Sequence, residues 1–268
     1  MPIQLTSPVD DKLMSFAVRN SRTKPMRVLH EGDYAGKTLA LCGAGPSLDP
    51  AEIDADYVFA CNSALPWLIR QGVAVDAGVS IDQTDVMLRD WAEIPAIDYL
   101  LASTVDPRLV RHVQAKGGRV RFFHSAVGFD NEFDFYCRHY PPTLMAGGGY
   151  TVVGRFLGVA RWLGFERIDV HGADHAFAED DVAHANGEKA EDAYTTPMVM
   201  TGYVDGRMWR TRADMLIAAV DLVRRVRNTP GLVRLIGDTL PNALLDKDEA
   251  FLDRVCRVLA PGEAVPTS

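Results

Sequence analysis

The sequence predicts a doubly wound, Rossmann-like α/β fold, with a mostly parallel sheet and helices on both of its faces. Short apolar runs of strand length alternate with stretches of helical periodicity, which is typical of a parallel sheet buried on both sides. The strands are expected at 38–42, 57–61, 77–81, 99–103, 120–123 and 168–171. Small or polar residues follow most of them, which favours a ligand crevice at the carboxyl ends of the strands.

The helices between these strands are predicted from apolar spacing and from glycine or proline at their ends. We expect helices at 64–71, 85–92, 107–116 and 150–163. The last shows the pattern most clearly, because its apolar residues share one face and Gly164 follows as a left-handed end residue. Residues 125–142 are rich in aromatics and less regular.

The alternation breaks after the sixth strand. Residues 178–210 carry a charged run and a hairpin signal at Asp205-Gly206, and an insertion at this place predicts a lid over the crevice. Thr211 and Asp214 have the spacing of a capping box before the last long helix. A short strand at 233–236 and a helix at 247–259 complete the pattern.

Three regions are expected from this pattern. They are an N-terminal arm (1–36), a nucleotide-binding domain (37–240) that includes the lid (178–210), and a C-terminal helix and tail (241–268).

Composition narrows the class of protein. The chain has 268 residues and a formal net charge of −8, which argues against a nucleic-acid-binding surface. Its four cysteines show no C-x-x-C spacing, so reduced thiols in a cytoplasmic protein are expected. No apolar run is long enough to span a membrane. The expected partners are a small-molecule nucleotide and an acceptor, and a homo-oligomer remains open.

The first glycine turn, Gly43-Ala44-Gly45-Pro46-Ser47, directly follows a predicted strand. Glycine lets a ligand approach the main chain, and Pro46 fits the first position of a helix. A strand, such a turn and a helix start together suit a phosphate. Leu48 stands where the dinucleotide fingerprint has its third glycine, and no P-loop lysine follows. The alternative is an ordinary strand-to-helix turn.

A second glycine turn, Gly147-Gly148-Gly149, precedes the helix expected at 150–163. Free N–H groups at a helix start need partners, so we expect a second anion site there, helped by Thr151. A flexible loop is the alternative.

Two carboxylates and two histidines complete the candidate site. Asp82 and Asp174 follow strands, where they either cap the next helix or bind Mg²⁺ beside a phosphate. His184 lies in the predicted lid and is a candidate general base, with an exposed loop histidine as the alternative. His175 is the other candidate, either as the base or as a donor to phosphate.

Four separated stretches resemble one family. They are LCGAGPSLD (41–49), FACNSAL (59–65) with VDAGVSIDQ (75–83), GGGYTVVGRFLGVARWLGFERIDVHGADHAF (147–177) and AHANG (183–187). Together they resemble the MptE-like 6-hydroxymethylpterin diphosphokinase family and the related flagellar motility accessory factors, which are thought to be glycosyltransferases. The first two stretches are also similar to the nucleotide site of bacterial sialyltransferases. The resemblance covers roughly residues 37–240.

The resemblance implies a nucleotide-dependent transferase. It implies a donor phosphate on Gly43, Gly45 and Ser47, with Asn62 touching the ribose or phosphate. Asp82 and Asp174 would then face the same crevice, and His184 would lie in the lid.

The first expectation for the reaction is transfer of diphosphate from ATP to a hydroxymethylpterin-like acceptor, with Mg²⁺. The runner-up is glycosyl transfer from a CMP-nonulosonate donor, which is favoured by the lack of Lys or Arg in the first glycine turn. A non-catalytic nucleotide-binding domain is the third, and it would leave the bound nucleotide unchanged.

Overall fold

A single sheet of eight parallel strands forms the centre of the molecule. The computed structural model describes residues 8–23, 28–126, 132–141, 145–189 and 199–257. The strand order is β10-β7-β1-β2-β3-β4-β5-β6, and every neighbouring pair is parallel. The predicted doubly wound, Rossmann-like fold is therefore confirmed.

The elements of the sheet and its covering helices follow one another along the chain. The strands of the main sheet are β1 (Thr38–Cys42), β2 (Tyr57–Cys61), β3 (Ala77–Ser80), β4 (Asp98–Ala102), β5 (Arg119–Ser125), β6 (Met145–Ala146), β7 (Arg167–His171) and β10 (Val233–Leu235). The helices are α1 (Pro8–Asn20), α2 (Ala64–Arg70), α3 (Val86–Asp90), α4 (Pro107–Ala115), α5 (Glu132–His139), α6 (Val152–Trp162), α8 (Ala213–Arg227), α9 (Leu240–Leu244) and α10 (Glu249–Arg257). A separate antiparallel hairpin joins β8 (Met200–Val204) to β9 (Arg207–Thr211).

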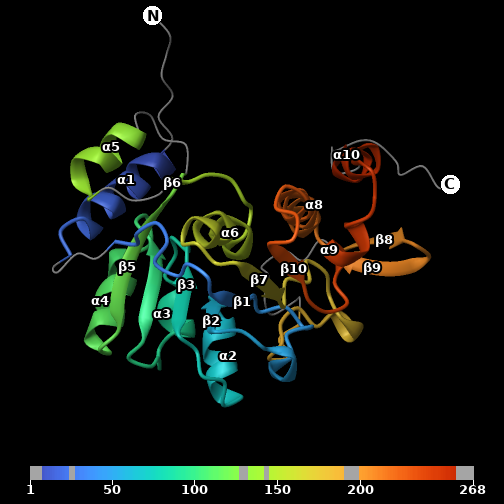
Figure 1. Ribbon diagram of the computed structural model, residues 1–268, viewed down its shortest axis with the longest axis horizontal. Coiled ribbons are helices and arrows are strands. Elements are labelled where there is room, and N and C mark those ends of the chain that lie inside the picture. The colour runs from blue at the N-terminus through green and yellow to red at the C-terminus, as the bar shows by residue number, and fades with distance from the viewer. Residues whose placement is uncertain (1–7, 24–27, 127–131, 142–144, 190–198, 258–268) are drawn as a thin grey trace, which may run out of the picture.

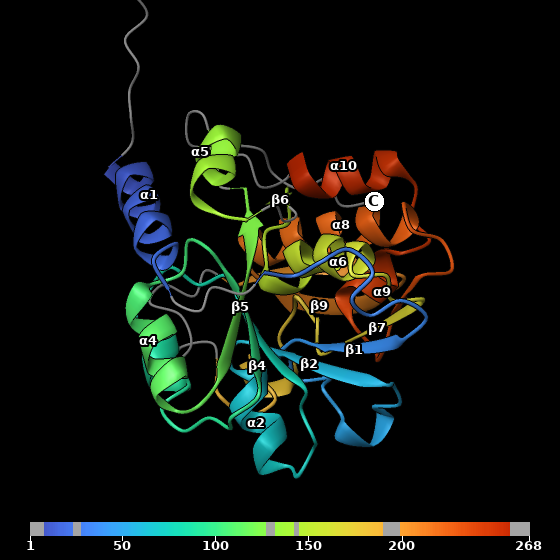
Figure 2. The ribbon, with the colours of Figure 1, turned by 60° about the vertical axis from the view of Figure 1, so that its left-hand side comes forward.

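The chain changes direction across the sheet between β6 and β7. Strands β1 to β6 are added one beside the next, and β7 then pairs with the other side of β1. Because crossovers between parallel strands are right-handed, α2 and α4 lie on one face of the sheet and α6 and α8 on the other (Figures 1 and 2). The β1–β7 pair is therefore the topological switch point, where this class of sheet binds its ligands.

Apolar packing fixes the switch point. Residues 39–42 of β1 have no exposed surface, as expected for a strand covered on both faces. The ring of Phe156, on α6, packs edge-on against Phe59 of β2 and Phe123 of β5, with centroids 6.0 and 5.6 Å away. Burial of each such ring stabilises the fold by roughly 1.5–3 kcal/mol. This packing holds α6 against β2 and β5.

Three local predictions are wrong. No α-helix begins at Pro46, because the chain runs on to a single 3₁₀ turn, Pro50–Glu52, which Asp49 caps through the Ala51 N–H at 2.9 Å. The predicted capping box is absent: the Thr211 hydroxyl donates instead to the His175 carbonyl, 2.6 Å away. The stretch 125–142 contains a helix, α5, and β6 follows it, so the sixth predicted strand is β7.

The lid prediction is met in part. The expected hairpin is present as β8 and β9, and Asp205 and Gly206 both have positive φ angles, 51° and 76°. Residues 190–198 of the predicted lid lie outside the described residues. The division into three regions stays a prediction, although β10 and α8 join the main sheet and its covering layer.

Two further expectations concern the whole chain. All four cysteines are free thiols. Within the described ranges, no helix has both the length and the apolar character that crossing a bilayer requires.

Candidate functional site

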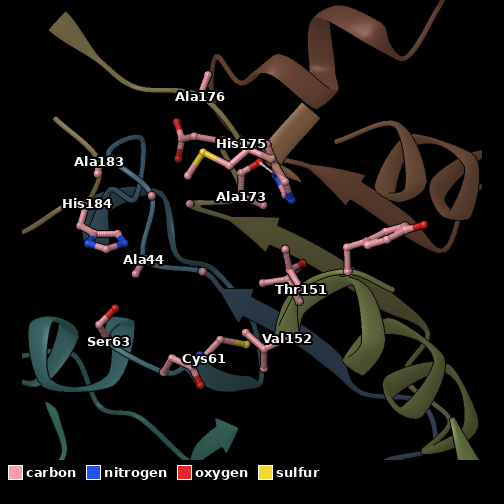
Figure 3. A pocket seen from close by; sticks show the side chains of 18 of the residues that line it. Ala44, Cys61, Ser63, Thr151, Val152, Ala173, His175, Ala176, Ala183 and His184 are labelled. Atoms are coloured by element: carbon pink, nitrogen blue, oxygen red, sulfur yellow. Dashed lines mark hydrogen bonds between the residues drawn. The ribbon is translucent and has the colours of Figure 1, made fainter. Parts of the chain in front are cut away.

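A pocket of about 400 Å³ lies at the switch point. Its wall is built from the segments that follow β1, β2, β3 and β7, from the start of α6 and from part of the predicted lid. In the view of Figure 3, His184 and Ser63 lie at one side of the pocket, and Thr151 and Val152 lie at the other. The predicted site residues in this wall are Gly43, Ala44, Gly45, Asn62, Asp82, Thr151, Asp174, His175 and His184.

The first glycine turn packs against the segment after β7. The N–H groups of Gly43 and Gly45 donate to the carbonyls of His171 and Gly172, both at 2.8 Å. A Cβ on Gly43 would lie 2.5 Å from the Gly172 oxygen, and one on Gly45 would overlap the Asp174 carboxylate. These glycines are therefore required by the neighbouring loop, and their two amides do not face a phosphate.

Ser47 and Asp174 connect the same two segments. The Ser47 N–H and hydroxyl both donate to the Asp174 carboxylate, at 3.2 and 3.0 Å. Pro46 and Ser47 do not belong to the pocket wall. Burial raises the pKa of Asp174 to about 6, against the opposing effect of the Ser47 hydrogen bonds. Asp174 therefore titrates just below neutral pH while it holds the first glycine turn in place.

The second glycine turn leads into a genuine helix start at the pocket. Thr151 is the N-cap of α6, and its hydroxyl accepts from the Gly154 N–H at 3.2 Å. Thr151, Val152 and Val153 line the pocket, so the positive end of the α6 dipole faces it. This is the structural setting in which proteins bind phosphate.

The three glycines of the second turn, Gly147, Gly148 and Gly149, precede this helix start and do not line the pocket themselves. The Arg155 guanidinium donates to the Gly149 carbonyl at 2.7 Å and to the Ser125 hydroxyl at 2.6 Å. Arg155 therefore braces the turn, and the turn positions the helix.

Asn62 is held in a strained conformation at the end of β2. Its φ angle is 47°, its N–H donates to the Val79 carbonyl at 3.0 Å, and its carbonyl accepts from the Trp91 indole at 2.8 Å. The side-chain oxygen is buried and has no hydrogen-bond partner among the described residues. A positive φ angle together with an unsatisfied polar atom in a pocket is consistent with the predicted ligand contact of Asn62, which stays a prediction.

His175, in the same pocket wall, has a similar character. Its φ angle is 52°, and its Nδ1 lies 2.8 Å from the Ala173 carbonyl. Since a carbonyl only accepts, Nδ1 carries the hydrogen. Burial lowers the pKa of His175, so at neutral pH its Nε2 carries a lone pair, and this atom is buried without a partner in the described structure. His175 can thus accept a proton or a hydrogen bond through Nε2 when its ring is neutral, and its two predicted roles, as a base or as a donor to phosphate, stay predictions.

His184 lies on a short hairpin that rests on the first glycine turn. Val182 pairs with Lys189 across this hairpin, and the Ala185 N–H donates to the Ala44 carbonyl at 2.9 Å. The Nδ1 of His184 lies 2.7 Å from the Glu188 carboxylate. Glu188 was missed by the sequence reasoning, although a carboxylate four residues after a candidate base was a signal available in the sequence.

Asp82 caps its own turn. Its Oδ1 accepts from the Thr84 N–H and hydroxyl, both at 2.7 Å, just before α3 begins. In the described part of the chain, no group of three or more His, Cys, Asp or Glu residues is arranged to hold a metal ion. Asp82 and Asp174 nevertheless share one pocket wall, so the Mg²⁺ site stays a prediction.

The fold is similar to that of a solved enzyme. The MAf glycosyltransferase from Magnetospirillum magneticum AMB-1 superimposes with a TM-score of 0.65 at 16% identity. The match covers 96% of this chain and 43% of the other, so this chain spans less than half the length of that protein. No curated protein matches the chain.

A family model supports the resemblance found in the four sequence stretches. The model, described as 6-hydroxymethylpterin diphosphokinase MptE-like, matches residues 14–180. This match covers more than half of the chain and includes β1 to β7, the first glycine turn and the start of α6. The chain belongs to the MptE-like family.

Proposed function

We propose that this chain is a transferase that binds a nucleotide donor in the switch-point pocket and transfers a glycosyl group from it. The proposed donor is a nucleoside monophosphate sugar of the CMP-nonulosonate type. Its phosphate would lie against the N–H groups at the start of α6, beside Thr151. Both the MptE-like family description and the name of the structural neighbour support a transferase.

The lack of basic side chains in the pocket wall is the observation that favours glycosyl transfer over diphosphate transfer. Among the described residues that form this wall, none is a Lys or Arg. Diphosphate transfer builds negative charge on several oxygens and needs metal ions and cationic donors to stabilise it. A single phosphate leaving group can instead be held by hydroxyl and amide donors.

The proposed step is a displacement at the anomeric carbon of the donor. The acceptor's oxygen forms a bond to this carbon, the bond from the carbon to the phosphate oxygen breaks, and the electron pair leaves with CMP. The proton of the acceptor hydroxyl goes to a base. His184 is the proposed base, and the unpartnered acceptor atoms of Asn62 and His175 would receive hydrogen bonds from N–H or O–H groups of the donor.

Diphosphate transfer from ATP to a hydroxymethylpterin is the second candidate. It is supported by the description of the family and by the two carboxylates, Asp82 and Asp174, in one pocket wall. These two residues would supply oxygen ligands to Mg²⁺, and phosphate oxygens and waters would supply the rest. Such an ion would offset the charge of the phosphates.

Product analysis tests the two candidates. The protein is incubated with CMP-N-acetylneuraminic acid plus galactose as a hydroxyl acceptor, and separately with ATP plus 6-hydroxymethyl-dihydropterin, and release of CMP or AMP is measured. We expect CMP release from the first donor. Pterin-dependent AMP formation would overturn glycosyl transfer in favour of the second candidate. Binding of CMP without any product would indicate a non-catalytic nucleotide-binding domain.

A further inference from the structure

A second pocket of about 550 Å³ adjoins the switch-point pocket. The two pockets share His184 and Ser63 in their walls. The rest of the second wall comes from α3 and from the hairpin that carries His184. Its lining includes Val86, Arg89, Asp90 and Glu188. His184 thus stands where one pocket meets the other.

We propose that this second pocket binds the acceptor of the transfer reaction, that the acceptor is an uncharged polyhydroxyl compound, and that Glu188 positions His184 between acceptor and donor. The proposal rests on the proposed glycosyl transfer for its chemistry. The location and the lining of the pocket do not depend on that reaction.

The lining of the second pocket favours sugar hydroxyls. Arg89 and Asp90 form an ion pair at 3.1 Å, and Glu188 adds a second carboxylate. This mixture of donors and acceptors matches hydroxyl groups, which do both, while two carboxylates disfavour an anionic acceptor. Val86 is the one large apolar side chain in the described lining, so a flat pterin ring would find little apolar surface there.

The His184–Glu188 pair sets the direction of proton transfer. The Glu188 carboxylate, 2.7 Å from Nδ1, accepts the hydrogen of that nitrogen, which assigns Nε2 the role of acceptor for the incoming hydroxyl. In the proposed step, the acceptor's proton moves to Nε2 as its oxygen bonds to the anomeric carbon, and CMP leaves with the electron pair. His184 then returns the proton to solvent. Glu188 lines the acceptor pocket, and in this step its carboxylate acts through Nδ1 of His184, so it is a positioning residue for the base.

The hairpin that carries this pair is well anchored. The N–H groups of Ala183 and Gly187 donate to the carbonyls of Glu188 and His184, at 2.8 and 2.9 Å. The Glu188 N–H donates to the Asn186 side chain at 3.0 Å. A hairpin closed by these bonds and tied to Ala44 holds His184 at one place between the pockets.

The first test measures the tautomer of His184 in the full chain by ¹⁵N NMR. We expect the Nδ1–H form in the wild type and in Glu188→Gln, which keeps an acceptor oxygen, and the Nε2–H form in Glu188→Ala. CMP-sugar turnover should fall at least about tenfold in Glu188→Ala and recover in part in Glu188→Gln. An unchanged tautomer in Glu188→Ala would overturn the positioning role.

The second test plugs the acceptor pocket. Val86 is 40% exposed at the start of α3, so Val86→Trp can fill the second pocket without disturbing the core. Met208→Trp is the matched control, because Met208 is 53% exposed on β9 and lies in neither pocket wall. Galactose, N-acetylglucosamine and mannose serve as probes, each titrated into ¹⁵N-labelled protein with and without saturating CMP.

The outcomes separate this inference from the proposed function. We expect at least one sugar to bind the wild type and Met208→Trp, and to bind Val86→Trp at least about tenfold more weakly, while CMP affinity is the same in all three. If no sugar binds, or if Val86→Trp binds it normally, the acceptor site is overturned while CMP binding still stands. If sugars bind as expected but CMP does not, the proposed donor is wrong and the sugar site remains. Should Val86→Trp fail to fold, the Glu188 variants and the wild-type titration still decide.

Discussion

The two glycine-rich turns of this chain look alike in sequence and differ in structure. Both follow an apolar segment and precede a stretch expected to be helical. The first, Gly43–Ser47, donates the N–H groups of its two glycines to carbonyls of the segment after β7, and no α-helix follows it. The second, Gly147–Gly149, leads into α6, whose first residues line the pocket. Of the two turns, only the second leads into a helix start that faces the pocket.

This difference shows that glycine can be required for two unrelated reasons. In the first turn, a side chain would collide with the loop that follows β7, so glycine permits two loops to pack closely at the switch point. In the second, Gly148 and Gly149 have φ angles of 71° and 92°, so glycine permits the sharp change of direction before α6. Neither requirement comes from a ligand, and the anion site results from the helix that follows.

The largest expected effect comes from a side chain in the first turn. In Gly45→Ala the new Cβ would overlap the Asp174 carboxylate and lie 2.8 Å from the Gly172 carbonyl oxygen. We expect the free energy of unfolding to fall by about 3 kcal/mol, at the upper end of ordinary substitutions. Urea unfolding followed by circular dichroism measures this change.

Gly147→Ala is the matched control. A Cβ there would meet nothing within 4 Å, and the φ angle of Gly147 is not positive. The expected change is within about 0.5 kcal/mol. Equal losses in the two variants would contradict the assignment of the first turn to loop packing.

Asp174, which receives the Ser47 hydrogen bonds, gives the second largest effect. Burial raises its pKa from 3.8 to about 6, so between these values the folded state binds the proton more tightly than the unfolded chain. The contribution of Asp174 to the free energy of unfolding therefore decreases as the pH rises from about 4 to about 6, and levels off above that range. The slope is about 1.4 kcal/mol per pH unit at most.

Asp174→Asn isolates this contribution. The variant cannot titrate at this position, so its stability relative to the wild type should increase between pH 4 and pH 6 and stay constant above that range. Urea unfolding at several pH values measures the difference. A constant difference across the whole range would mean that the Asp174 pKa is not raised, and that the first turn is held by an ordinary exposed carboxylate.

The sheet and most of its helices could be predicted from the sequence because their signals are local. The strand at 38–42 and the helix around Phe156 each bury a continuous apolar face, and periodicity records this directly. By contrast, α5 and β6 were missed. The eight residues of α5 give a weak periodic signal, and β6 has only two residues, which no pattern can identify.

The candidate site was predicted less completely, because its geometry depends on contacts between distant segments. The sequence located Asn62, Asp82, Asp174 and His184 at one crevice, since the carboxyl ends of parallel strands meet there. It could not show that Asp174 would accept from Ser47, 127 residues away. That contact uses the Ser47 N–H, and the Gly43 and Gly45 N–H groups donate to the carbonyls of His171 and Gly172, so three of the turn amides expected to face a phosphate have partners within the protein.

A smaller effect is expected at Thr151, the N-cap of α6, which follows the second glycine turn and lines the pocket. Thr151→Ala removes the hydroxyl that accepts from the Gly154 N–H, and loss of an N-cap costs about 1 kcal/mol. The start of α6 should fray, so CMP affinity should fall by roughly three- to tenfold. Thr151→Ser keeps the hydroxyl and should retain both stability and affinity. Calorimetric titration with CMP measures the affinities, and unchanged affinity in Thr151→Ala would place the phosphate away from this helix.

The smallest expected effect is that of Mg²⁺ on CMP binding. The proposed monophosphate site relies on the N–H groups and the dipole of α6, which need no metal to stabilise one phosphate group. Asp82 and Asp174 already accept hydrogen bonds from Thr84 and Ser47, so a metal would have to compete with these donors. We expect CMP affinity with millimolar Mg²⁺ and with EDTA to agree within about twofold.

The contradicting outcome is that Mg²⁺ strengthens ATP binding and that Asp82→Asn or Asp174→Asn abolishes this gain. The segments after β3 and β7 would then supply a metal site, and diphosphate transfer would become the better-supported reaction. The phosphates would then be held from both sides of the pocket, with the metal on one side and the start of α6 on the other.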